Sequence, residues 1–432
     1  MSHAVSIRPR WSLTPGAILL PSADRKRKSK LVSVARKLKP FRLFLLACVL
    51  HASAQTAPHP RGSTLADAEP SRTQVSRAIS LSADYLIRAC GPDGKFVYQV
   101  DIDSGREIRL YDIVRHAGAM YAMGMLEHDA PDQRVADALL RAGAYLRQNY
   151  IGPGGHEGTL AVYSHRKPQG SLPILGGVGL GLVALAAVNE VRPNSVPLAE
   201  MQALGRFALF VQKSDGSFNP DPSHNEPVIV DSPFFPGEAV LGFITLYEAD
   251  HSPDWLMAAT RALSYLARQR AGVSRAPVDH WALIATSRLL PYCDRGPCSA
   301  FREELITAGV QNCTSILKEQ INRPSDALDG AFDEFGRITP TAARMEGLLA
   351  ALEFLPDSHA RLRAEIESAV KRGIAFLLRV QIQSGPYQGG MPGAYSKAVP
   401  EASQVRIDYL QHPMCAWIRY QRRFKLPADA GM

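Results

Sequence analysis

The sequence predicts an all-α fold, an (α/α)6 toroid in which six helical hairpins form an inner and an outer ring. Three observations carry this prediction. An amphipathic helix, a Gly-containing loop and a second, more apolar helix follow one another repeatedly. This unit recurs six times with a spacing of about forty to sixty-five residues, and the alternation that marks strands is nearly absent. Repeated hairpins of this kind close into a ring, because each pair needs neighbours to bury its apolar faces.

The first helix of each pair has one wet face. Apolar residues recur at i, i+3, i+4 and i+7 with Arg, Lys, Gln or Glu between them, as in ALLRAGAYLRQNY. We predict these outer helices over residues 73–90, 132–150, 195–212, 253–270, 300–322 and 360–383.

The second helix of each pair is apolar on every side and rich in Gly and Ala, as in HAGAMYAMGM and GGVGLGLVALAAV. A helix of this composition is buried on every side. We predict these inner helices over residues 112–128, 175–191, 237–249, 278–290, 342–355 and 408–422. The last inner helix is expected to lie beside the first, which closes the ring.

The basic charge of the chain belongs to its N-terminus. The 432 residues are 46% hydrophobic and 21% charged, as in an ordinary globular protein, with a net charge of +8. Residues 1–54 hold eleven Lys and Arg against one acid, Asp24, which leaves about −2 for the remainder. We therefore expect no nucleic-acid partner.

The N-terminus predicts export. A basic segment, an apolar run over residues 43–50 and a small-x-small site at Ala52 and Ala54 are typical of a signal peptide, here residues 1–54. The product would be periplasmic or secreted, with residues 55–70 as a linker and 71–432 as the toroid domain, and no stable span would remain after cleavage. A lipoprotein attached through Cys48, an uncleaved anchor and a start downstream of Met1 are the alternatives.

Two cysteines flank a turn in PYCDRGPCS. In an oxidising compartment Cys293 and Cys298 would close a small disulfide loop, and two free thiols between helices are the alternative. The sequence has no CxxC pair and no His/Cys cluster of zinc spacing, so no metal and no cofactor is predicted.

Three segments, FALFVQKSDGSF, YLIRACGPDGKF and FLLRVQIQSG, resemble the outer-helix-to-turn elements of the terpenoid cyclase and protein prenyltransferase toroids. The same helix-DG-x-F turn recurs in six-hairpin glycosidases, lyases and epimerases. Phe96 and Phe218 stand where Trp is usual, and Cys90 replaces a Gln. The resemblance spans essentially residues 71–425 and implies the toroid fold, but it does not select an activity, because one fold hosts many functions.

In such a toroid the first turns of the inner helices line a common funnel at one end of the barrel. These turns hold acids, bases and an aromatic ring, and the candidate site residues are Asp112, Arg115, His116, Asp231, Glu238, Asp279, His280, Trp281, Arg344, Glu346, Arg406, Asp408, Tyr409, Gln411 and His412. Single Asp residues here also suit helix caps. The whole set is more polar than a buried hydrophobic core tolerates, which predicts a solvent-filled site.

Carboxylates lead the candidate catalytic set. Glu238 and Glu346 are the sole carboxylates on apolar first turns, where desolvation raises a pKa, and glycoside chemistry needs one protonated and one ionised carboxylate. Asp408 and His412 complete the catalytic set, with Asp231 and Asp279 as further candidates for the base. The remaining candidates are expected to bind substrate, and the arginines among them suit a carboxylate-bearing sugar.

Aligning the inner helices on a polar-then-small step places five polar or aromatic residues at one level of the funnel: His116, Glu238, Trp281, Glu346 and His412. A lyase or epimerase would instead use one of these His, His280 or Tyr409 as the base.

The predicted function is therefore an exported carbohydrate-active enzyme, a glycoside hydrolase or a polysaccharide lyase or epimerase, with a sugar in its funnel. A non-catalytic toroid that binds a glycan or a protein is one alternative. A terpenoid cyclase-like protein is another, although VDIDSG and LDGAFDEFG are loose acidic turns rather than a tight Asp cluster. A metal held by the His residues is a further alternative. No P-loop, dinucleotide fingerprint or HExxH motif is present.

Overall fold

The computed structural model describes residues 69–165, 171–218, 232–274, 277–294 and 296–424. The chain divides into two units, Met1–Arg61 and Gly62–Met432, and every described residue belongs to the second. The predicted signal peptide, Cys48 and most of the predicted linker lie outside the described residues.

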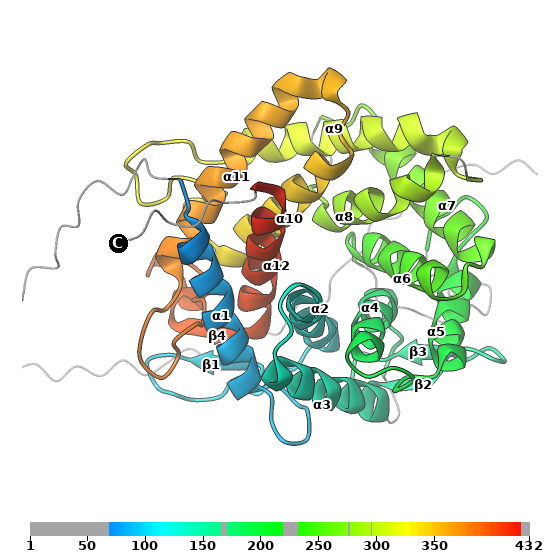
Figure 1. The fold of residues 1–432 in the computed structure, drawn as a ribbon, viewed down its shortest axis with the longest axis horizontal. Helices are drawn as coiled ribbons and strands as arrows, with labels where there is room; N and C mark the ends of the chain where they lie inside the picture. The colour runs from blue at the N-terminus through cyan, green and yellow to red at the C-terminus, as the bar shows by residue number, and fades with distance from the viewer. Residues whose placement is uncertain (1–68, 166–170, 219–231, 275–276, 295, 425–432) are drawn as a thin grey trace, which may run out of the picture. The chain divides into compact units, whose positions relative to one another are not determined.

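Twelve α-helices form two concentric rings over the described residues, which confirms the predicted (α/α)6 toroid (Figure 1). The outer helices are α1 (Arg72–Ala89), α3 (Gln133–Tyr150), α5 (Leu198–Val211), α7 (Pro253–Arg270), α9 (Arg302–Glu319) and α11 (Ala360–Val380). The inner helices are α2 (Ile113–Asp129), α4 (Leu175–Val191), α6 (Phe235–Asp250), α8 (His280–Leu289), α10 (Ile338–Phe354) and α12 (Ile407–Phe424).

The inner ring is closed. Each inner helix packs against the next in the order α2, α4, α6, α8, α10 and α12, and α12 packs in turn against α2. The outer helices cover the seams, as α7 does against α6 and α8. The core is one continuous cluster of buried apolar side chains from both rings. This core fixes the six inner helices so that their first turns surround one axis. A funnel shared by all six helices requires this arrangement.

Local sequence explains where the inner helices begin. The side chain of Asp112 accepts from the backbone N–H groups of Val114 and Arg115, and Asp279 accepts from that of Ala282, so both act as N-caps. Helix α10 begins four residues before its predicted start and contains Pro340 in its first turn. Proline is tolerated there because a first-turn N–H has no acceptor within the helix.

Glycine lets α4 and α6 approach closely. A Cβ atom on Gly179 would collide with the backbone of Glu238 and Ala239, and one on Gly176 would collide with the Glu238 side chain. The glycine run of α4 therefore makes room for a buried carboxyl on its neighbour.

In the described residues, four short strands form two antiparallel pairs. Strand β1 (Gln99–Asp101) pairs with β4 (Gln404–Arg406), with Val100 opposite Val405, and β2 (Ile151–Pro153) pairs with β3 (Leu160–Val162). Since β4 runs directly into α12, the first pair ties the start of the last inner helix to the segment before α2.

Short 3-10 turns occupy Leu290–Cys293, Ser299–Phe301, Asp357–His359 and Pro400–Ser403. Cys293 and Cys298 form a disulfide, which decides between the two alternatives that the sequence left open. Among the described helices, none has the length and apolar character that crossing a membrane would need.

Candidate functional site

A cavity of about 420 Å3 opens among the first turns of the inner helices. Nine of the candidate residues line it, from five inner helices: Asp112, Arg115, Glu238, His280, Trp281, Arg344, Asp408, Gln411 and His412. The sixth inner helix, α4, contributes Leu180. The cavity falls within the size range of small-molecule sites and combines aromatic surface with convergent polar groups.

Glu238 lies in the α6 wall of the cavity as a neutral acid. Burial, together with the nearby charges of Asp279 and Asp112, raises the pKa of its carboxyl to about 8, against a smaller opposing effect of Arg115. Its Oε2 atom is buried and has no hydrogen-bond partner among the described residues. At neutral pH the group therefore holds a proton that it can donate.

Arginines and aspartates from strand β4 and from the starts of α2 and α12 form a cluster beside the cavity. Arg115 donates to Asp112 and to the hydroxyl of Tyr98, and its Nε lies 3.2 Å from Oδ2 of Asp408. Arg406 donates from Nε and Nη2 to the two oxygens of Asp408. Asp408 is thus held between two guanidinium groups.

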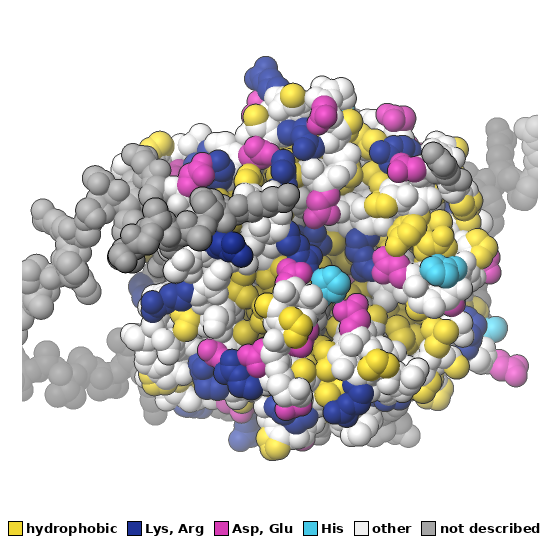
Figure 2. Space-filling view, viewed as in Figure 1, with side chains coloured by type: hydrophobic (Ala, Val, Ile, Leu, Met, Phe, Trp, Pro, Cys, Tyr) yellow, Lys and Arg dark blue, Asp and Glu magenta, His cyan; other side chains and the backbone are white. Residues whose placement is uncertain are grey.

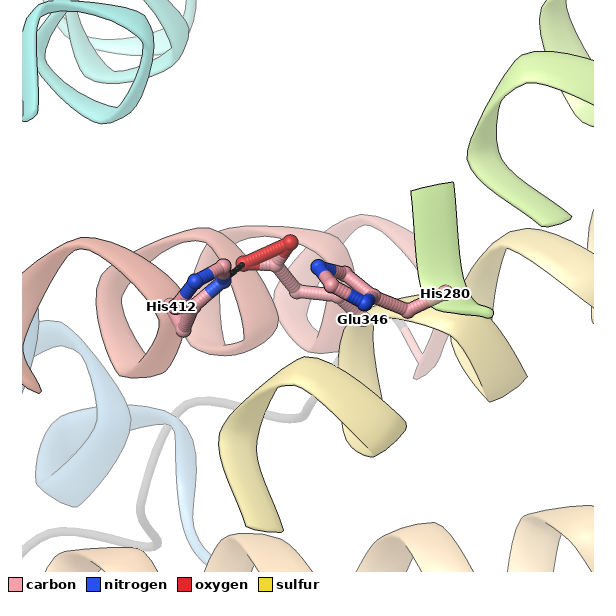
Figure 3. Close-up of side chains that lie close together, drawn as sticks. All are labelled: His280, Glu346 and His412. Carbon is pink, nitrogen blue, oxygen red and sulfur yellow. Dashed lines mark hydrogen bonds and ion pairs between the residues drawn. The ribbon is translucent and has the colours of Figure 1, made fainter. Parts of the chain in front are cut away.

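Two histidines and a glutamate meet where α8, α10 and α12 come together (Figure 3). Nδ1 of His412 lies 3.3 Å from Oε1 of Glu346, and the rings of His280 and His412 are 5.2 Å apart between centroids. Both rings line the cavity, whereas Glu346 is fully buried behind them. Burial lowers the pKa of His280 well below its usual value, and His412 and Arg344 lower it further, so this ring is neutral.

The same three residues are a candidate metal centre. One ligand atom from each of His280, Glu346 and His412 lies within 4.8 Å of the others. Nε2 of His280 and Oε2 of Glu346 are buried and have no hydrogen-bond partner in the part of the chain that the structure describes. Small side-chain rotations would bring two imidazoles and a carboxylate to bonding distance of one divalent ion. The existing contact between His412 and Glu346 is the alternative use of this cluster, in which the carboxylate orients the ring.

Five candidate residues are described but do not line the cavity: His116, Asp279, Glu346, Arg406 and Tyr409. Asp231 lies outside the described residues. His116 is fully buried, where its Nε2 donates to the carbonyl of Ala142 and its Nδ1 accepts from the hydroxyl of Tyr111. Burial lowers its pKa to about 4. The side chain of His116 therefore helps α2 to pack against α3.

Asp279 and Tyr409 are also held in the protein interior. Asp279 caps α8 and receives a hydrogen bond from Arg270 at 2.8 Å. The ring of Tyr409 is covered by the guanidinium of Arg406, 4.3 Å from the ring centroid. These contacts leave both residues with structural roles in the wall around the cavity.

Some lining residues were not among the candidates. Thr339 and Pro340 line the cavity from the turn of α10 that the sequence placed outside the helix, and Ser232 and Val278 lie before α6 and α8. The hydroxyl of Thr339 is buried and has no hydrogen-bond partner among the residues described. Counting the polar residues of ITPTAARMEG from its first residue would have included it.

The opposite end of the barrel has a second hollow, of about 330 Å3. Its charged side chains are paired across neighbouring inner helices: Arg288 with Glu248, and Arg419 with Glu353. Figure 2 shows basic and acidic side chains close together around the centre of the ring. These pairs link neighbouring helices of the inner ring.

No family model matches the chain, and no curated protein matches it. Solved structures share its fold. Cellobiose 2-epimerase from Bacillus thermoamylovorans is 10% identical, with a TM-score of 0.59 over 81% of this chain and 98% of that one. A D-mannose isomerase is 12% identical, with a TM-score of 0.56 over 81% and 98%. A possible member of the GH105 family from Klebsiella pneumoniae is 13% identical, with a TM-score of 0.54 over 89% and 100%. At these identities the similarity establishes the fold, which these sugar-related proteins share.

Proposed function

We propose that this chain is a carbohydrate-active enzyme of the epimerase or isomerase kind, which moves a proton at the carbon next to a sugar carbonyl. One observation carries the proposal. A single cavity combines the neutral carboxyl of Glu238 with two histidines, one of which is backed by a buried carboxylate. This combination supplies a proton donor and a proton acceptor near neutral pH.

The proton acceptor is His412. When its Nδ1–H donates to Glu346, the Nε2 lone pair is left for the substrate, and the ring keeps this orientation. In an open-chain sugar His412 takes the proton from the carbon beside the carbonyl while Glu238 gives its proton to the carbonyl oxygen, which forms an enediol. His412 then gives the proton to the neighbouring carbon while Glu238 takes up the proton of the other enediol oxygen, which yields the isomer. If the enediol first turns its other face to His412, return of the proton to the first carbon, with the oxygen proton returned to Glu238, yields the epimer.

His280 and the aromatic residues hold the sugar. The neutral His280 ring accepts a hydrogen bond from a sugar hydroxyl, since its Nε2 has no hydrogen-bond partner within the described part of the chain. Trp281, Phe234 and Phe235 line the same cavity and offer flat apolar surface to a sugar ring. That proteins named as a cellobiose 2-epimerase and a D-mannose isomerase share the fold supports this class of reaction.

A glycoside hydrolase is the second candidate, and the position of Asp408 favours it. Glu238 would protonate the leaving oxygen, and Asp408, which lines the same cavity, would act as base or nucleophile. Both oxygens of Asp408 already accept hydrogen bonds from Arg406, and Arg115 also contacts it, so attack on a sugar carbon would require these contacts to break, which is why we place the hydrolase second.

We also propose that the protein is exported after cleavage behind Ala54, on the strength of its basic and apolar leader. N-terminal sequencing of the protein from the periplasm or medium tests this, and an intact Met1 on a cytoplasmic product would contradict it.

The reaction is tested by incubating the purified protein with reducing monosaccharides and disaccharides and resolving epimers and isomers by chromatography. Reducing ends from neutral and uronic polysaccharides, and unsaturated products, are measured in parallel. We expect interconversion of sugars, with loss of turnover in Glu238→Gln and His412→Asn. New reducing ends without interconversion would support the hydrolase, and binding without turnover would support a binding protein.

A further inference from the structure

We propose that the cavity selects an uncharged sugar, because Glu319 neutralises Arg344 in the cavity wall and aspartates hold the other arginines of the site. This inference rests on the sugar-binding cavity of the proposed function and names its substrate class. It makes Glu319, a residue outside the cavity, a determinant of specificity.

Arg344 is the cavity arginine that an acidic sugar would need. It lies on α10, lines the cavity and has a side chain only 19% exposed. Its Nη2 donates to Oε2 of Glu319 at 2.6 Å, and its Nη1 donates to the carbonyl of Pro340 at 3.1 Å. The guanidinium also lies 5.1 Å from the centroid of the Phe332 ring. Both terminal nitrogens therefore have protein acceptors, and the charge has a carboxylate partner.

The arginines from α2 and β4 are also paired. Arg115 is shared between Asp112 and Asp408, and Arg406 binds Asp408 with two nitrogens. In this cluster two guanidinium groups face two carboxylates, so it presents no net positive charge. A sugar carboxylate placed here would lie beside Asp112 and Asp408 and be repelled by them.

The polar groups that lack partners suit hydroxyl groups. Five cavity-lining residues have a buried atom with no hydrogen-bond partner among the described residues: Nε2 of Gln411, the hydroxyl of Thr339, Oε2 of Glu238, Nε2 of His280 and Nε of Arg344. A buried polar atom without a partner is costly, and a sugar hydroxyl satisfies either a donor or an acceptor. The described lining thus offers neutral hydrogen bonding and aromatic surface, and its charges are compensated.

Glu319 can be changed without altering the cavity wall. It lies at the end of the outer helix α9, its side chain is 47% exposed, and it does not line the cavity. Glu319→Gln removes the charge that compensates Arg344 and keeps the size of the side chain. Arg344 would then offer an uncompensated guanidinium to a ligand carboxylate.

The test is equilibrium binding of D-glucose, D-mannose and D-glucuronate, measured by calorimetry on the full-length protein, the Glu319→Gln variant and a control. We expect the wild type to bind a neutral sugar more tightly than D-glucuronate. Glu319→Gln should raise the affinity for D-glucuronate relative to D-glucose about tenfold. The matched control is Glu304→Gln. Glu304 also lies on α9, and its carboxylate pairs with Arg268 on α7, so this variant should leave the ratio of the two sugar affinities unchanged.

Tighter binding of D-glucuronate by the wild type, or no binding of any of the three sugars, would overturn the inference. An unchanged ratio in Glu319→Gln would overturn the role of Glu319. The proposed reaction fails separately, if neutral sugars bind as expected but are not interconverted.

Discussion

Replacing Glu238 by Gln should stabilise the protein, and more so as the pH rises. The carboxyl is 4% exposed, and its pKa is about 8 in the folded chain against 4.5 for an ordinary Glu. Between these values the folded state binds the proton and the unfolded state does not, so stability falls as the pH rises and levels off above pH 8. The free energy of unfolding lost in this way is at most about 5 kcal/mol. The Gln variant avoids this loss because its side chain does not ionise.

The measurement is urea or thermal unfolding of wild type and Glu238→Gln at pH 5 and pH 9. We expect the variant to gain stability relative to wild type by several kcal/mol between these pH values, while it loses turnover. The control is Glu157→Gln, at an exposed loop carboxylate, for which the difference should stay constant. An equal offset between Glu238→Gln and wild type at both pH values would refute the assignment of Glu238 as a buried neutral acid.

Three further outcomes are expected. Glu346→Gln should lower kcat about tenfold to a hundredfold with little change in KM, and should shift the pH profile of kcat, because the substitution loosens the orientation of His412. Lower thermal stability with unchanged kinetics would instead give Glu346 a structural role. Replacing Cys293 and Cys298 by Ser should cost about 2 kcal/mol of unfolding free energy for so short a loop, and reductant should give the wild type the same loss; if neither changes stability, the disulfide does not form in solution. Dialysis against a chelator should leave turnover intact, whereas loss restored by Zn2+ or Mn2+ would make His280, Glu346 and His412 a metal centre.

The ring could be predicted from sequence because its signal is long and repeated. One wet face marked the outer helices, and Gly-rich, wholly apolar segments marked the inner ones. The predicted start of α10 at residue 342 leaves out the first turn of the helix, which contains Pro340, a residue type that fits a first turn.

The site could be predicted only in part, because an inner helix buried on every side carries no polar face to orient it. His116, Glu346 and His412 share one level in the register, but their directions around the helix axis differ. His412 lines the cavity, Glu346 lies behind it, and His116 turns to a carbonyl of α3. Spacing along the chain predicts height in the barrel, and packing between neighbouring helices decides direction.

The pairing of the arginines could not be predicted from the sequence either. Arg344 and Glu319 are far enough apart in the chain that only the docking of α9 against α10 brings them together. Their contact reverses the expectation, drawn from arginine content alone, that the funnel suits a carboxylate-bearing sugar, and this reversal is part of what we propose.

The most direct test of the account is the transfer of hydrogen from solvent to sugar carbon. The protein is incubated in D2O with D-glucose, D-mannose or cellobiose, and deuterium at the carbon next to the carbonyl is measured by NMR. The account predicts that deuterium enters this position with the wild type, and that His412→Asn abolishes the exchange. Cleavage of glycosidic bonds with no deuterium at carbon would contradict it and assign the cavity to hydrolysis.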